Sequence, residues 1–265
     1  MKRFIKLLRM SLILTGGSAC AASFSAFGDG EELVYKVGWG VLGGAGEVKI
    51  TAHAGKSDKG VPLMRIVMVT NSKGIVNGVY KYESTAEVLL EQNTGRLLSA
   101  KENGVKRSEP IESHTDFDYA AHQAHHRDVH RPERNRDIAL PANVTPVDLI
   151  STLVATRNWK LKPGDTRDVV VFAGRDLFPV TVHAEGKEAV KTPLGNFESL
   201  VLSPRMEKEE PRGIFKRDNP IKVWIAQRAP FLPVQMQLQL SIGTATLTLK
   251  EYHPPKTPPA VASDS

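Results

Sequence analysis

Near its C-terminal end the chain alternates apolar and polar residues with a period of two. Val234, Met236, Leu238 and Leu240 occupy every second position, and the positions between them are all glutamine. Successive side chains of a β-strand point to opposite faces of a sheet. The alternation therefore predicts a strand with one buried and one solvated face, and it excludes an amphipathic helix over these residues.

Shorter segments of this kind recur along the chain and are separated by turn residues. Residues 48–52 alternate in the same way, and residues 63–69 are apolar on both faces except for Arg65. Asn93-Thr94-Gly95 predicts a turn, and Asn103-Gly104 is the dipeptide most typical of a two-residue hairpin. The repeated strand–turn spacing predicts a mainly β fold whose antiparallel sheet curves into an open, barrel-like domain.

One main helix is predicted at about residues 146–160. Thr145 is placed to cap it, with Pro146 at the first helical position, and Pro163-Gly164 ends the segment. Its apolar residues form one stripe at helical spacing: Leu149, Ile150, Leu153 and Val154. We expect this stripe to cover the concave side of the sheet, opposite Met236 and Leu238.

The N-terminal segment has the order of a secretory signal. Residues 1–9 carry four basic side chains and no acidic one, and an apolar stretch and then small residues follow. We predict a signal peptide over residues 1–28 and a periplasmic mature protein. Gly17-Ser18-Ala19-Cys20 leaves lipoprotein processing at Cys20 open as a second route. Cys20 is the only cysteine, so the domain beyond it has no thiol for disulfides, catalysis or zinc binding.

The composition indicates an ordinary globular domain, since 41% of the residues are hydrophobic and 24% are charged. We predict a single β-rich domain over residues 29–253 and a disordered Pro-rich tail over residues 254–265. The formal charge of +6 falls when the signal peptide is removed, because 31 basic then face 29 acidic residues. That balance argues against a nucleic-acid partner. We expect a monomer without a transmembrane span after signal cleavage.

Histidines gather between residues 114 and 130. On a helix the spacing of four between His122, His126 and His130 would place them on one face, where they could bind zinc. The sequence lacks a His-Glu-x-x-His motif, and residues 127–132 alternate like an exposed strand that ends at a proline. On a strand, residues four apart lie roughly 13 Å apart and cannot share one metal ion. We therefore interpret the stretch as a solvated loop or edge, with a zinc site as the alternative.

Other motifs give no support for an enzyme. The chain has no G-x-S-x-G motif, and the glycines of residues 38–46 lack both the P-loop ending and the Rossmann spacing. They are typical of a tight, bulged turn. The mixed-charge run at residues 205–217 predicts an exposed loop. We expect no catalytic residue and no cofactor.

Three stretches together resemble domain of unknown function family 3108, a set of exported bacterial proteins. They are residues 33–46, which open with Leu-Val-Tyr-Lys-Val-Gly-Trp-Gly, residues 146–151, and the pair of segments at 192–197 and 223–234. The family's usual acidic residue after the tryptophan strand is replaced here by Gln227 and Arg228. The resemblance extends over about residues 31–252 and implies an exported β-rich domain, without an established activity.

The segment from Trp224 to the alternating strand is also similar to periplasmic lipoprotein and lipid carriers. Those proteins are open half-barrels with helices over the concave face, which implies an apolar cavity that can hold an acyl chain. We therefore expect a non-enzymatic binder of a lipid or other apolar envelope ligand. An assembly partner of an envelope complex and a histidine-dependent metal enzyme remain as alternatives. The expected ligand contacts are Trp39, Leu149, Leu153, Trp224, Met236 and Leu238.

Overall fold

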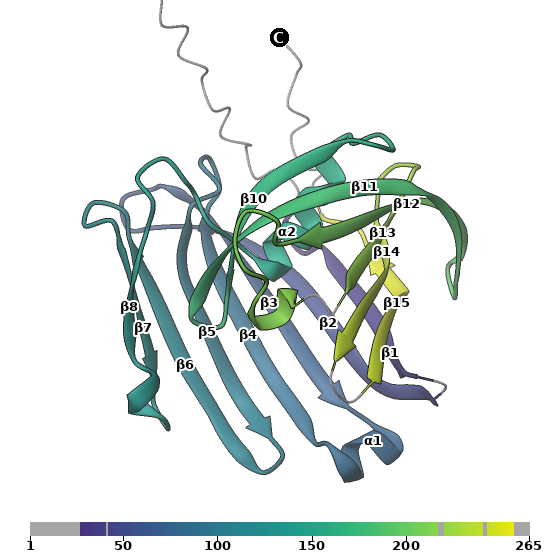
Figure 1. Ribbon diagram of the computed structural model, residues 1–265, viewed down its shortest axis with the longest axis horizontal. Coiled ribbons are helices and arrows are strands. Elements are labelled where there is room, and N and C mark those ends of the chain that lie inside the picture. The colour runs from purple at the N-terminus through teal and green to yellow at the C-terminus, as the bar shows by residue number, and fades with distance from the viewer. Residues whose placement is uncertain (1–26, 41, 217–219, 241–242, 257–265) are drawn as a thin grey trace, which may run out of the picture.

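The computed structural model describes residues 27–40, 42–216, 220–240 and 243–256. The strands in these ranges form one curved sheet in the order β8-β7-β6-β5-β4-β3-β2-β1-β15-β14-β13-β12-β11-β10-β9 (Figure 1). Neighbouring strands are antiparallel, except that β9 and β10 are parallel. The first half of the chain extends the sheet outward from β1, and the second half returns to pair β15 with β1. The predicted curved, open antiparallel sheet is confirmed.

The strands come in two runs along the chain. In the first half they are β1 (Glu32–Trp39), β2 (Leu42–Lys56), β3 (Pro62–Ser72), β4 (Tyr82–Glu91), β5 (Leu97–Lys106), β6 (Glu109–Asp118), β7 (Gln123–Asp128) and β8 (Arg136–Ala139). In the second half they are β9 (Val147–Asp148), β10 (Thr166–Ala173), β11 (Asp176–Thr192), β12 (Gly195–Arg205), β13 (Ile221–Ala226), β14 (Pro233–Leu240) and β15 (Gly243–His253). The helices are α1 (Gly74–Val79) and α2 (Leu149–Ala155), with 3-10 turns η1 (Pro132–Arg134), η2 (Thr156–Asn158) and η3 (Gly213–Phe215).

Side chains connect the two ends of the sheet. The ring of Phe172 on β10 meets the ring of Phe117 on β6 edge-on, with centroids 5.1 Å apart. Nearby, Arg136 on β8 forms an ion pair with Asp176 on β11 at 2.6 Å. Within the described residues β8 pairs through its backbone with β7 only, so the sheet stays open and side-chain contacts alone connect its two ends.

Helix α2 lies inside the curl of the sheet (Figure 1), but it is shorter than predicted. Its cap is Asp148, whose side chain accepts hydrogen bonds from the N–H groups of Ile150 and Ser151 at 2.8 and 3.0 Å. The prediction of Thr145 as the cap is therefore wrong. Residues 147–148 pair with β10 as strand β9, and this extended backbone delays the helix until Leu149.

The hairpin expected at Asn103-Gly104 is also wrong. Both residues lie inside β5. The chain reverses after the end of that strand, at Arg107 and Ser108, which have φ of 51° and 75°. Gly104 is needed because the β4 backbone lies against it: a Cβ there would be 2.1 Å from the carbonyl oxygen of Glu83. The turn predicted at residues 93–95 is confirmed.

The buried residues form one large cluster on the concave side, where α2 contributes Ile150, Leu153 and Val154. A second cluster lies between β10–β13 and η3. The predicted signal peptide falls almost entirely outside the described residues, as does the tail beyond Lys256. Lys256 itself donates its backbone N–H to the carbonyl oxygen of Asp29 at 2.9 Å, so the tail begins beside the start of the domain. Among the described residues, no helix is both long and apolar enough to cross a membrane.

Candidate functional site: an apolar cavity under helix α2

A cavity of about 470 Å³ lies between α2 and the concave face of the sheet. Helix α2 lines it with Leu149, Ile150 and Leu153, and the turn η3 adds Ile214 and Phe215. Trp159, just after η2, also lines it, and the sheet supplies the remaining apolar lining from β1, β2, β3 and β10–β15: Val37, Val48, Ile50, Met68, Val169, Val171, Val180, Val182, Leu202, Pro204, Ile221, Val223, Met236, Leu238, Ala245 and Leu247. The volume is within the roughly 300–1,000 Å³ typical of small-molecule sites.

Few polar groups are directed to this cavity. Two of its threonines belong to the helical segment, and their hydroxyls are used by the helix itself. Thr152 donates to the carbonyl oxygen of Asp148 at 2.6 Å, and Thr156 donates to that of Leu153 at 2.5 Å. The other two hydroxyls of the lining, those of Thr70 and Tyr82, lie on neighbouring strands β3 and β4. The lining hydroxyls that the helix does not use thus lie on the β3–β4 side of the cavity.

Helix α2 is fixed at both ends by buried polar groups. At its start the Asp148 carboxylate caps the helix and also accepts a hydrogen bond from the Ser151 hydroxyl. Burial raises the pKa of this carboxyl, and the hydrogen bonds from Ser151 and Ile150 oppose that shift. Beyond its end, Arg157 donates to the buried Glu31 carboxylate at 2.8 Å and to the carbonyl oxygen of Pro230 at 3.0 Å. These contacts tie η2 to the segment before β1 and to the turn before β14.

The structure brings four of the six predicted ligand contacts together. Leu149, Leu153, Met236 and Leu238 all line the cavity, whereas Trp39 and Trp224 are not part of its lining. Leu149 is 42% exposed, which places it at the solvent side of the helix. The helix–strand arrangement expected from the periodicity is therefore present, and binding at these side chains remains a prediction.

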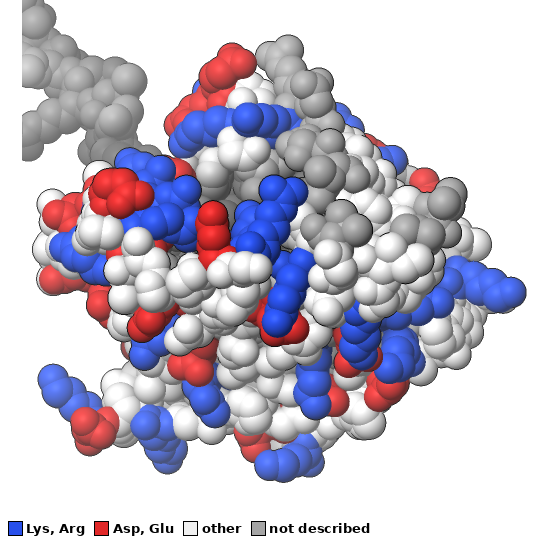
Figure 2. Space-filling view, turned by 90° about the horizontal axis from the view of Figure 1, so that it is seen from below, with Lys and Arg blue, Asp and Glu red and all other residues white. Residues whose placement is uncertain are grey.

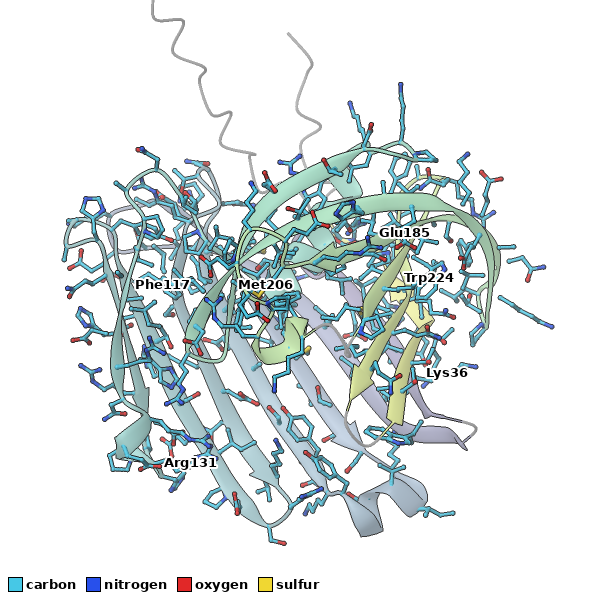
Figure 3. The ribbon with its side chains drawn as sticks, in the orientation of Figure 1. Lys36, Phe117, Arg131, Glu185, Met206 and Trp224 are labelled. Atoms are coloured by element: carbon cyan, nitrogen blue, oxygen red, sulfur yellow. The ribbon has the colours of Figure 1, made fainter. Side chains whose placement is uncertain are left out.

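The two tryptophans have other surroundings. Trp224, labelled in Figure 3, is buried in the main cluster, and its indole N–H donates to Glu188 at 2.8 Å. Trp39 packs at the end of β1, where a Cβ on Gly243 would be 3.0 Å from its indole nitrogen.

In the segment at residues 205–217, the exposed loop predicted from the charges is wrong at two positions, because Met206 and Phe215 are buried.

Sequence reasoning missed a polar cluster beside the cavity. Tyr82, which is one of the lining residues, donates its hydroxyl to Glu102 Oε1 on β5 at 2.9 Å. Ser84 donates to the same oxygen at 3.0 Å. Tyr82, Ser84 and Glu102 are separated by up to twenty residues in the chain, and only the β4–β5 register brings them together. No local motif could have indicated this cluster.

Most of the chain matches one family model. The model, of proteins of unknown function and named DUF3108, matches residues 34–250. The chain belongs to the DUF3108 family. The resemblance inferred from its motifs is confirmed. No curated protein sequence matches the chain.

Two solved structures are similar to this DUF3108 protein. One is a beta-barrel-like protein of the DUF1849 domain from Brucella abortus, with a TM-score of 0.51 and 7% identity, covering 87% of this chain and 100% of that one. The other is a candidate lipoprotein from Parabacteroides distasonis, with a TM-score of 0.32 and 10% identity, covering 86% and 98%. At this identity the first likeness concerns the fold alone.

The histidines between residues 114 and 130 of this DUF3108 protein lie on the β6–β7 hairpin and just after it. His122 is in its turn with φ of 53°, His130 lies 3.6 Å from Glu112, and His126 is buried with Nδ1 2.9 Å from the Thr115 hydroxyl. The stretch is strand and turn and not a helix, but the prediction of a solvated loop or edge is wrong for β7, which pairs with strands on both sides and buries His126. Across the described residues no three His, Cys, Asp or Glu side chains form a group that could hold a metal ion.

The outer surface has no region dominated by one sign of charge in the view of Figure 2, where basic and acidic side chains lie interspersed. Many of them are paired, for example Arg65 with Glu87 at 3.2 Å and Lys49 with Glu32 at 2.6 Å.

Proposed function

We propose that this protein is a non-enzymatic binder of a lipid or other apolar ligand in the periplasm. The observation that carries the proposal is the cavity under α2, which combines a volume of about 470 Å³ with a lining of aliphatic side chains. Each methylene of a bound acyl chain that leaves water contributes roughly 0.8 kcal/mol. A ligand with an acyl chain would therefore be stabilised by this lining.

The exposure of the lining supports the same function. Val37, Met68, Met236, Leu238 and Leu247 line the cavity and are only half-buried. Protein cores are packed with few voids larger than a water molecule. Aliphatic side chains that face a cavity and solvent together are stabilised when an apolar ligand covers them.

The location is proposed from the N-terminal segment. Residues 1–28 would direct export, and processing at Cys20 would leave the protein lipid-anchored instead of free in the periplasm. A reporter fused to residues 1–30 should leave the cytoplasm. Labelled palmitate should enter the protein, and be lost in Cys20→Ala, only if the lipoprotein route is used. A reporter that stays cytoplasmic and uncleaved would refute export.

Native mass spectrometry of protein purified without detergent tests the function. We expect a mass excess that corresponds to one amphiphile and disappears after extraction with organic solvent. The extracted protein should then bind the neutral fluorescent probe N-phenyl-1-naphthylamine at one site. Protein that shows neither a mass excess nor probe binding would refute the proposal. Stoichiometric copurification with an envelope protein would then favour the assembly-partner alternative.

A further inference from the structure

The hydroxyl and carboxylate groups beside the cavity form a defined arrangement. Ser84 is 6% exposed, and its hydroxyl and that of Tyr82 both donate to one oxygen of Glu102. Burial raises the pKa of Tyr82, and the negative charge of Glu102 adds to the shift, so the phenol remains a donor at all physiological pH values. These two bonds fix the orientation of a half-buried carboxylate.

The second oxygen of this carboxylate has a different environment. Both hydroxyl donors reach Oε1, and within the described ranges no hydrogen bond to Oε2 is found. Over the same ranges no lysine, arginine or histidine forms an ion pair with Glu102, whereas other carboxylates of the sheet have one, such as Glu87 with Arg65 and Glu185 with Arg205. A partly desolvated carboxylate is stabilised by a cation or by additional donors.

The position of Glu102 connects it to the cavity. It pairs across the β4–β5 ladder with Ala86 and across the β5–β6 ladder with Ser113. Side chains directly opposite in a ladder share one face. Ala86 packs against the main core cluster on the concave side, so Glu102 projects to that side too. Tyr82 lines the cavity and donates its hydroxyl to Glu102, so it connects the cavity with this carboxylate.

We propose that Glu102 binds the polar end of the ligand and that this end carries a protonated amino group. The inference rests on the proposed function and specifies its ligand class as a single-chain amphiphile with a cationic head. The chain lies among the aliphatic side chains under α2, and the ammonium group donates to Glu102 Oε2 beside Tyr82. A carboxylate or phosphate head at the same place would be repelled, since like charges at short range disfavour each other.

Displacement of N-phenyl-1-naphthylamine by three probes of equal chain length tests this at neutral pH, below their micelle concentrations. The probes are dodecylamine, dodecanol and dodecanoate. We expect the amine to bind about tenfold or more tighter than the carboxylate, which is the size expected for a charge-assisted hydrogen bond, with the alcohol between them. In Glu102→Gln the difference should fall to about twofold or less.

Two further variants make the result unambiguous. Glu112→Gln changes an exposed carboxylate of the next strand, opposite Asn103, and should keep the wild-type order of probes. Glu102→Lys should reverse the order, so that dodecanoate binds tighter than dodecylamine, and a misfolded protein could not produce that reversal. Equal affinity for all three probes in the wild type would overturn the role of Glu102 while leaving an apolar carrier in place. If none of the three probes binds and the fluorescent probe does not bind either, the proposed carrier function is refuted.

Discussion

Arg157 and Glu31 form a buried ion pair that we expect to hold helix α2 over the cavity. Their side chains are 7% and 0% exposed, and Arg157 Nη1 lies 2.8 Å from Glu31 Oε1. Removing one partner of such a pair leaves an uncompensated buried charge, which costs about 3–5 kcal/mol.

The perturbation is Glu31→Gln, which keeps the shape of the side chain and removes its charge. We expect the free energy of unfolding, measured by urea denaturation, to fall by about 3 kcal/mol because the buried guanidinium of Arg157 loses its attraction to the charge of Glu31. Arg157→Met should have a similar effect. The loss of stability in the double variant should be smaller than the sum of the losses in the two single variants, by at least about 2 kcal/mol. That difference is within the range of coupling between contacting residues.

An exposed pair provides the control. Arg65 and Glu87 lie 3.2 Å apart with side chains 49% and 33% exposed, so Glu87→Gln should change stability by less than about 1 kcal/mol. We also expect faster amide exchange over residues 149–158 in Glu31→Gln, because the tie between η2 and the sheet is lost. If Glu31→Gln lowers the free energy of unfolding no more than Glu87→Gln does, the ion pair does not hold the helix.

Burial and packing lead to three further predictions. Leu153→Ala should cost about 2 kcal/mol, at the low end for buried leucines because its methyl groups already face a cavity, and should weaken binding of the fluorescent probe; unchanged stability and binding would contradict this. Burial lowers the pKa of His126, so the folded state binds its proton less readily than the unfolded state does, and stability should fall as the pH drops below about 6.5. That loss, followed by thermal unfolding from pH 7 to 5, should be smaller in His126→Asn but unchanged in the exposed-turn variant His122→Asn. Gly104→Ala should destabilise by about 1–3 kcal/mol in urea denaturation, whereas Gly186→Ala, which has open space, should be tolerated.

The sequence-based prediction succeeded where the information is local and periodic. The period of two along residues 234–240 predicted β14, and the stripe that includes Ile150, Leu153 and Val154 predicted which face of α2 turns inward. Both patterns reflect burial of one face, which the residues themselves record.

Predictions failed where strand pairing overrides local preference. Asn103-Gly104 favours a hairpin, but the close approach of β4 requires Gly104 in the middle of a strand. Pairing of residues 147–148 with β10 moved the cap from Thr145 to Asp148. Glu102 had no sequence signal, because its partners Tyr82 and Ser84 reach it only through the β4–β5 register.

The central claim is that the cavity under α2 receives an apolar ligand, and two adjacent residues of β14 test it directly. Met236 lines the cavity and Gln237 does not, since successive side chains of a strand point to opposite faces. N-phenyl-1-naphthylamine should be titrated into delipidated wild type, Met236→Trp and Gln237→Trp. We predict single-site binding in the wild type and Gln237→Trp, and its loss in Met236→Trp, whose indole fills the cavity. Equal binding by both tryptophan variants would contradict the claim.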